Sequence, residues 1–165
     1  MPMPVLPAGH VVTAAELKQI TDQIDSLTAP GWTPYGTAGT IIGASVTNPA
    51  LGNSTWAARY RRAAGSDIVF CEGRIAIGST FAPGNGVYRF AVPFNASSSA
   101  VANVVGQGFI FDAGTANRQG TIRFESAGFF NIYLHDSFSG VTNAGSGTAW
   151  ATNDVIAWSL AYQPA

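Results

Sequence analysis

The chain carries little charge. Only 10% of its 165 residues are Asp, Glu, Lys or Arg, whereas about 25% is usual for soluble domains. Two interpretations fit this composition: part of the surface is buried between subunits, where charge is depleted, or the chain is a neutral β-sandwich. The one basic cluster, Arg59, Arg61 and Arg62, alternates with Tyr60. This spacing is typical of a solvated strand face, so we expect no nucleic-acid partner.

Cysteines and long apolar runs are also scarce. Cys71 is the single cysteine, which excludes an internal disulfide, and its apolar neighbours predict a small buried side chain. No segment approaches the roughly 20 apolar residues that span a bilayer, so we expect no membrane partner. Residues 1–7, Met-Pro-Met-Pro-Val-Leu-Pro, lack the basic and apolar regions of a signal peptide. We therefore expect synthesis in the cytoplasm, with any exterior location reached by assembly.

Groups suited to catalysis are few and scattered. His135-Asp136-Ser137 holds the residue types of acyl transfer, but neighbours on a strand point to opposite faces and cannot converge. Glycoside hydrolysis needs two facing carboxylates. The carboxylates of the C-terminal region are Asp67, Glu72, Asp112, Glu125, Asp136 and Asp154. No phosphate loop, dinucleotide fingerprint or calcium-loop spacing occurs. We predict no enzyme activity, catalytic residue, cofactor or metal site; a glycan depolymerase is the catalytic alternative.

The N-terminal residues predict an extended arm. The prolines in residues 1–12 disfavour a helix and favour extended chain. We interpret this segment as an arm that docks to another protein, and the alternative is an unattached terminus. The residues expected to dock are Pro2, Pro4, Val5, Leu6 and Pro7.

Residues 13–28 predict a short helix that associates with copies of itself. Thr13-Ala14-Ala15-Glu16 matches a capping box, and Pro30-Gly31 ends the helix near Leu27. The apolar residues follow the a/d spacing of a coiled coil: Leu17, Ile20, Ile24 and Leu27. Two heptads are too short to be stable alone. Either the following domain also associates, or the helix packs on its own domain.

The rest of the chain predicts β-structure. Residues 29–54 are expected to form a linker with one or two strands, and residues 55–165 a β-domain. Alternating apolar residues between turn-like segments mark seven strands. They are Trp56–Arg62, Asp67–Ile77, Val87–Val92, Val101–Phe111, Thr121–Glu125, Phe129–His135 and Val155–Tyr162. About eight antiparallel strands favour a jelly-roll-like β-sandwich.

Loop aromatics are the candidates for sugar binding by stacking. They are Tyr35, Phe81, Phe138 and Trp150. The competing interpretation is that each ring is tucked beneath its own turn.

A set of turn and strand motifs over roughly residues 13–162 carries a resemblance. They are Thr28-Ala-Pro-Gly-Trp32, Ala58-Arg-Tyr-Arg61, Gly73-Arg-Ile-Ala-Ile-Gly78, Gly86-Val-Tyr-Arg-Phe-Ala-Val-Pro93, Trp150-Ala-Thr-Asn-Asp-Val-Ile156 and Tyr162. The chain resembles small structural proteins of tailed phages of actinobacteria, and the C-terminal β-modules of their minor tail proteins and fibres. The resemblance implies a trimeric jelly-roll knob, similar in shape to tumour-necrosis-factor and complement-C1q domains. It supplies no functional residues.

Together these observations predict a non-enzymatic virion protein. We expect a homotrimer with a helical stem over residues 13–28, an arm that contacts other virion proteins, and an exposed knob that attaches to a host cell-surface glycan. The alternative is a head-fibre or decoration protein of the capsid that binds no receptor.

Overall fold

The computed structural model describes residues 13–15, 18, 31–63, 66–101, 103–114, 116–135 and 150–165. These residues are mainly β. The strands are β1 (Thr33–Pro34), β2 (Ile42–Ala44), β3 (Thr55–Arg62), β4 (Val69–Ala76), β5 (Tyr88–Ala91), β6 (Val104–Asp112), β7 (Ala116–Ser126), β8 (Phe129–Leu134) and β9 (Val155–Tyr162).

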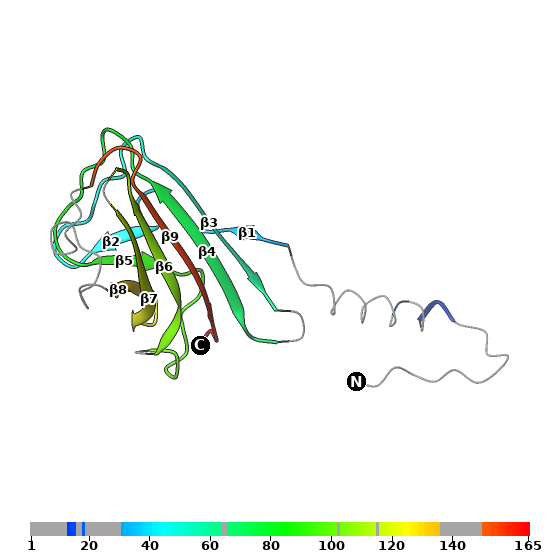
Figure 1. The fold of residues 1–165 in the computed structure, drawn as a ribbon. Helices are drawn as coiled ribbons and strands as arrows, with labels where there is room; N and C mark the ends of the chain where they lie inside the picture. Colours follow the sequence, from blue (N-terminus) through cyan, green and yellow to red (C-terminus); the bar gives the residue numbers. More distant parts are fainter. Residues whose placement is uncertain are drawn as a thin grey trace.

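The strands form one antiparallel sheet that curls (Figure 1). Their order is β1-β3-β4-β9-β6-β7-β8-β5-β2, and every neighbouring pair is antiparallel. The two edge strands, β1 and β2, are only two and three residues long, and β1 pairs with only Arg59 and Tyr60 of the eight-residue β3. The mainly β, antiparallel class is therefore confirmed, whereas the jelly-roll sandwich stays a prediction.

The core lies on the concave side of the curled sheet. Trp158 on β9 contacts Phe90 on β5 and Phe130 on β8, with ring centroids 5.1 and 6.0 Å apart. Strands β6, β7 and β8 separate β5 from β9 in the sheet, so these contacts cross the core and hold its two halves together. Gly73 and Gly108 permit this closeness, because a Cβ on either would collide with Trp158 or Ile132.

The alternation of buried and more exposed residues that the sequence predicts along the strands is observed. On β9 the buried residues are Ile156, Trp158, Leu160 and Tyr162, and the residues between them are more exposed. Because successive strand residues point to opposite faces, one face of β9 lines the core and the other faces away from it. Cys71 is buried as predicted, with 1% of its surface exposed.

All seven expected strands are present, and the largest difference lies at β7. This strand begins at Ala116, although the alternating pattern starts only at Thr121. Residues 116–120 are Ala-Asn-Arg-Gln-Gly and show no apolar alternation. They become a strand because they pair residue for residue with β6, from Asp112↔Ala116 to Gly108↔Gly120.

The predicted stem and arm lie almost wholly outside the described residues. Ala14, Ala15 and Lys18 have helical geometry. The predicted seam and docking residues are not described: Leu17, Ile20, Ile24 and Leu27, and Pro2, Pro4, Val5, Leu6 and Pro7. The helical stem and the docking arm therefore stay predictions.

Candidate functional site

The convex face of the sheet presents two rows of uncharged side chains across β9, β6, β7 and β8. Phe109 of β6 lies opposite Ala157 of β9 and opposite Gln119 of β7. Gln107 of β6 lies opposite Ser159 of β9 and opposite Thr121 of β7.

Strand β8 completes both rows. Tyr133 is the partner of Thr121, and the backbone N–H of His135 donates to the Gln119 carbonyl oxygen at 3.0 Å. The first row is Ala157, Phe109, Gln119 and His135; the second is Ser159, Gln107, Thr121 and Tyr133. Side chains directly opposite each other on antiparallel strands lie about 5 Å apart, so each row is a continuous strip.

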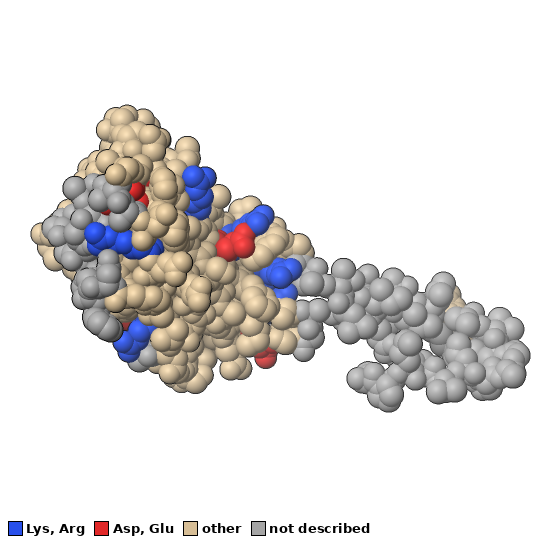
Figure 2. Space-filling view, viewed as in Figure 1, with Lys and Arg blue, Asp and Glu red and all other residues tan. Residues whose placement is uncertain are grey.

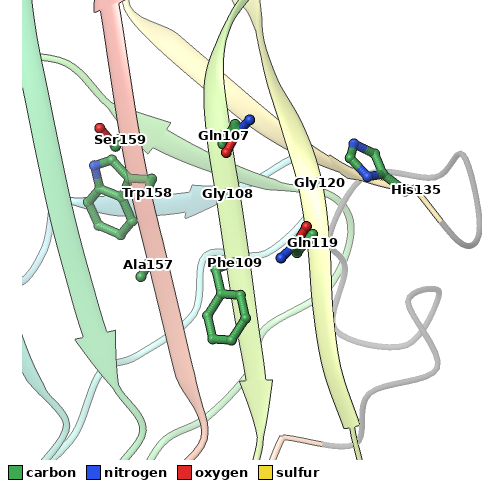
Figure 3. Close-up of a pocket in the computed structure, with 9 residues that line it drawn as sticks. All are labelled: Gln107, Gly108, Phe109, Gln119, Gly120, His135, Ala157, Trp158 and Ser159. Carbon is green, nitrogen blue, oxygen red and sulfur yellow. The ribbon is translucent and has the colours of Figure 1, made fainter.

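A shallow groove of about 330 Å³ lies over the first row and part of the second. Its floor includes Gly108 and Gly120, which have no side chain, and Ala157, which has a short one. Longer side chains border it, and Figure 3 shows Gln107 and Gln119 on neighbouring strands with His135 at the end of β8. Gly108 and Gly120 lie opposite the buried residues Trp158 and Leu134, so their backbone forms the floor between the two outward rows.

The groove offers hydrogen-bonding groups that the described part of the protein leaves to solvent. Gln107, Gln119 and Ser159 are exposed, and within the described residues their side chains make no hydrogen bond to protein groups. Each Gln amide supplies both a carbonyl acceptor and an NH₂ donor, and the Ser hydroxyl can do either. Phe109 adds a half-buried ring. The site can therefore bind a neutral molecule with many hydroxyl groups and an apolar face.

The face seen in Figure 2 is dominated by uncharged atoms, with charged side chains in a few small groups. Two carboxylates are already bound to arginines: Arg59 Nε donates to Glu72 Oε1 at 2.6 Å, and Arg89 binds both oxygens of Glu125 at 2.8 and 3.1 Å. These two carboxylates are thus balanced by arginines, and no Asp, Glu, Lys or Arg lines the groove.

The remaining described carboxylates do not converge on the groove. Asp154 is fully buried and accepts the backbone N–H groups of Ala113 and Ala151 at 2.9 and 2.7 Å, which ties two loops together. Asp112 is buried nearby at the end of β6. Asp67 lines a hollow with Arg62 instead. Asp136 and Ser137, beside His135, lie outside the described residues. In the described ranges, no three His, Cys, Asp or Glu residues gather as a metal site would require.

The groups with shifted pKa values lie in the core. Burial raises the pKa of Cys71 to about 12, with an opposing hydrogen bond from Tyr162. Burial likewise raises the pKa of the Tyr35, Tyr88 and Tyr162 hydroxyls. These groups stay protonated at neutral pH, so they keep the core uncharged.

Three of the four loop aromatics named as sugar-stacking candidates do not line the groove. Tyr35, Phe81 and Trp150 are partly buried and packed against the core, which favours the tucked interpretation. Phe138 lies outside the described residues. The sequence analysis missed Gln107 and Gln119, and the pattern Gly106-Gln107-Gly108 was the available indication. Polar side chains that alternate with glycines on a strand predict one bare face and one hydrogen-bonding face.

The comparisons with known proteins give no family. No family model matches the chain, and neither a curated protein nor a solved structure is significantly similar to it. A search of the described residues for a helix long and apolar enough to cross a bilayer also finds none.

Proposed function

We propose that this protein is a virion surface protein of a tailed phage, an oligomeric knob that attaches to a host cell-surface glycan. The observation that carries the proposal is the neutral groove, which is lined by two amides, a hydroxyl and an aromatic ring. Sugars present many hydroxyl groups on a ring whose C–H faces are apolar. Gln107 and Gln119 can bind the hydroxyls, and Phe109 can pack against a C–H face.

The phage context is supported by the sequence resemblance rather than by the groove. The motifs from Thr28 to Tyr162 resemble those of small structural proteins of actinobacterial tailed phages. The low charge is consistent with surfaces buried between subunits. A homotrimer held by the 13–28 helix would present three grooves, and several weak sites on one particle raise the overall affinity.

The predicted jelly-roll-like shape of the knob is part of the same proposal. A jelly-roll-like knob needs two β-layers around one core. Contacts of Trp158 with Phe90 and Phe130 press the two halves of the curled sheet against each other, which supports such a shape. The arm over residues 1–12 would join the knob to other virion proteins.

A glycan array made from cell-wall polysaccharides of actinobacterial hosts tests the proposal. We expect the full chain to bind a subset of these glycans, and a Gln107→Ala, Gln119→Ala double variant to bind about tenfold more weakly, since each lost hydrogen bond contributes ~0.5–1.5 kcal/mol. The matched control is Gln163→Ala, which removes an exposed glutamine amide outside the groove and should bind as the wild type does.

Three outcomes contradict the proposal in different ways. Equal binding by the double variant and the control would place the glycan site elsewhere. Absence of glycan binding, together with incorporation into particles, would favour the capsid decoration or head-fibre alternative. Shortening of a bound polysaccharide during incubation would favour a depolymerase.

A further inference from the structure

A strip of apolar side chains crosses one end of the convex face. Ile68 and Phe70, at the start of β4, alternate with buried residues and point outward. Phe70 pairs with Ala161 of β9. Beyond β9, Val104 at the start of β6 pairs with Arg123, the next outward residue of β7 after the second row. Strands β4 and β6 both run antiparallel to β9, so their first residues lie at the same end of the sheet. We call Ile68, Phe70, Ala161 and Val104 the apolar strip.

The apolar strip is open to solvent in the single chain. Ile68 and Phe70 each have 36% of their surface exposed, and Val104 has 62%. These are three of the six large apolar side chains that are exposed within the described part of the chain. Single exposed apolar residues are common on protein surfaces, whereas several gathered at one place mark an interaction surface.

The chain arrives at this strip from the segment that is predicted to form the stem. The Trp32 ring lies against two outward arginines of β3, with the guanidinium carbons of Arg59 and Arg61 4.8 and 5.0 Å from its centroid. The guanidinium carbon of Arg61 also lies 5.5 Å from the centroid of the Phe70 ring. Cation–π contacts therefore hold Trp32 beside the apolar strip.

The length of chain before Trp32 limits how far the predicted stem can lie from the strip. Only residues 29–31 separate the stem, predicted over residues 13–28, from Trp32. Four Cα–Cα steps span at most about 14 Å. In an assembly held by the stem, the axis that relates the copies therefore passes close to the strip. Surfaces beside such an axis face the same surfaces of the other copies.

The stem also needs further contacts to hold an assembly together. Two heptads are too short to be stable alone, so the β-domains have to contribute part of the contact. The apolar strip with Trp32 and Arg61 has the composition of such a contact, because aromatic residues and arginine are enriched in interfaces.

We propose that the apolar strip is the surface through which the β-domains of associated copies meet: Ile68, Phe70 and Val104 of one copy pack against the strip of a second copy beside the stem. This inference rests on the oligomeric knob of the proposed function and adds the contact between the knobs. No residue of the strip lines the groove, so copy contact and glycan binding can be altered separately.

Sedimentation of a double variant of the full chain tests the strip. Phe70→Asp with Val104→Asp places charges in the contact, where an unpaired buried charge is costly. We expect assembly to require at least about tenfold more protein than the wild type needs. The matched control is Phe111→Asp with Val46→Asp, which adds the same charges at side chains that are 40% and 70% exposed outside the strip. This control should assemble as the wild type does.

Cross-linking tests the same contact with milder changes and decides the matter if the double variant fails to fold. Val104→Cys and Val46→Cys each place one thiol at an exposed valine, and the native Cys71 is buried and shielded from reagents. A short bismaleimide should join copies of Val104→Cys into covalent dimers. It should leave Val46→Cys as single chains.

The outcomes separate this inference from the proposed function. An assembled wild type, with the strip variant assembling equally well and no cross-linking through Val104→Cys, would overturn the strip and leave the oligomeric knob standing. A monomeric wild type would overturn both the strip contact and the oligomer, and the helix of the same chain would then be the segment to test against the strip. Loss of glycan binding by the Gln107→Ala, Gln119→Ala variant tests the groove independently of either result.

Discussion

At the scale of single residues, burial decides which polar groups the fold can hold. Cys71 and Tyr162 lie on neighbouring core strands with 1% and 3% of their surfaces exposed, and the Tyr162 hydroxyl donates to the Phe94 carbonyl oxygen at 2.8 Å. A thiolate or phenolate there would lose its hydration without a compensating cation. The protonated, neutral forms of the Cys71 thiol and the Tyr162 hydroxyl therefore contribute to the stability of the core.

Cys71 makes folding stability depend on alkaline pH. Its pKa is about 12 in the folded protein, against an ordinary value of 9.0. Above pH 9 the unfolded chain loses this proton while the folded protein keeps it, so the unfolding free energy falls as pH rises through this window. Urea titrations between pH 8 and 10 measure the fall. Cys71→Ala should reduce the slope, and an identical slope in wild type and variant would refute the assignment.

At the scale of elements, period-two alternation made the strands predictable. Ile156, Trp158, Leu160 and Tyr162 occupy every second position of β9, and all four are buried. The order of the strands was not predictable, because the same pattern fits any partner. Only the fold pairs Gln107 with Ser159 and Thr121. The sequence could therefore indicate a hydrogen-bonding face around Gln107, but not the groove, because its polar residues come from different strands that only the register aligns.

The helix predicted over residues 13–28 can be tested as an element. Ile20→Asp with Ile24→Asp places charges in the predicted a/d seam, where an unpaired buried charge is costly. We expect this double variant to sediment as a smaller species than the wild type. The matched control, Gln19→Asp with Gln23→Asp, adds the same charge outside the a/d positions and should keep the assembly. An unchanged sedimentation coefficient in the seam variant would show that the helix does not hold the copies together.

At the scale of the whole molecule, the proposal requires several knobs in one assembly. A single groove of about 330 Å³ on an open sheet face is shallow, and a weak site becomes effective when copies are linked. The low charge of the chain fits surfaces that are buried between copies. The argument from linked weak sites and the argument from buried uncharged surface both depend on how many chains associate in solution.

The solution mass of the purified full chain, measured by light scattering, tests this central claim most directly. One chain has a mass of 17.1 kDa, and we predict a mass near three times that value. A monomer would contradict the account, because the predicted helix would then pack on its own domain and each groove would have to bind its ligand alone.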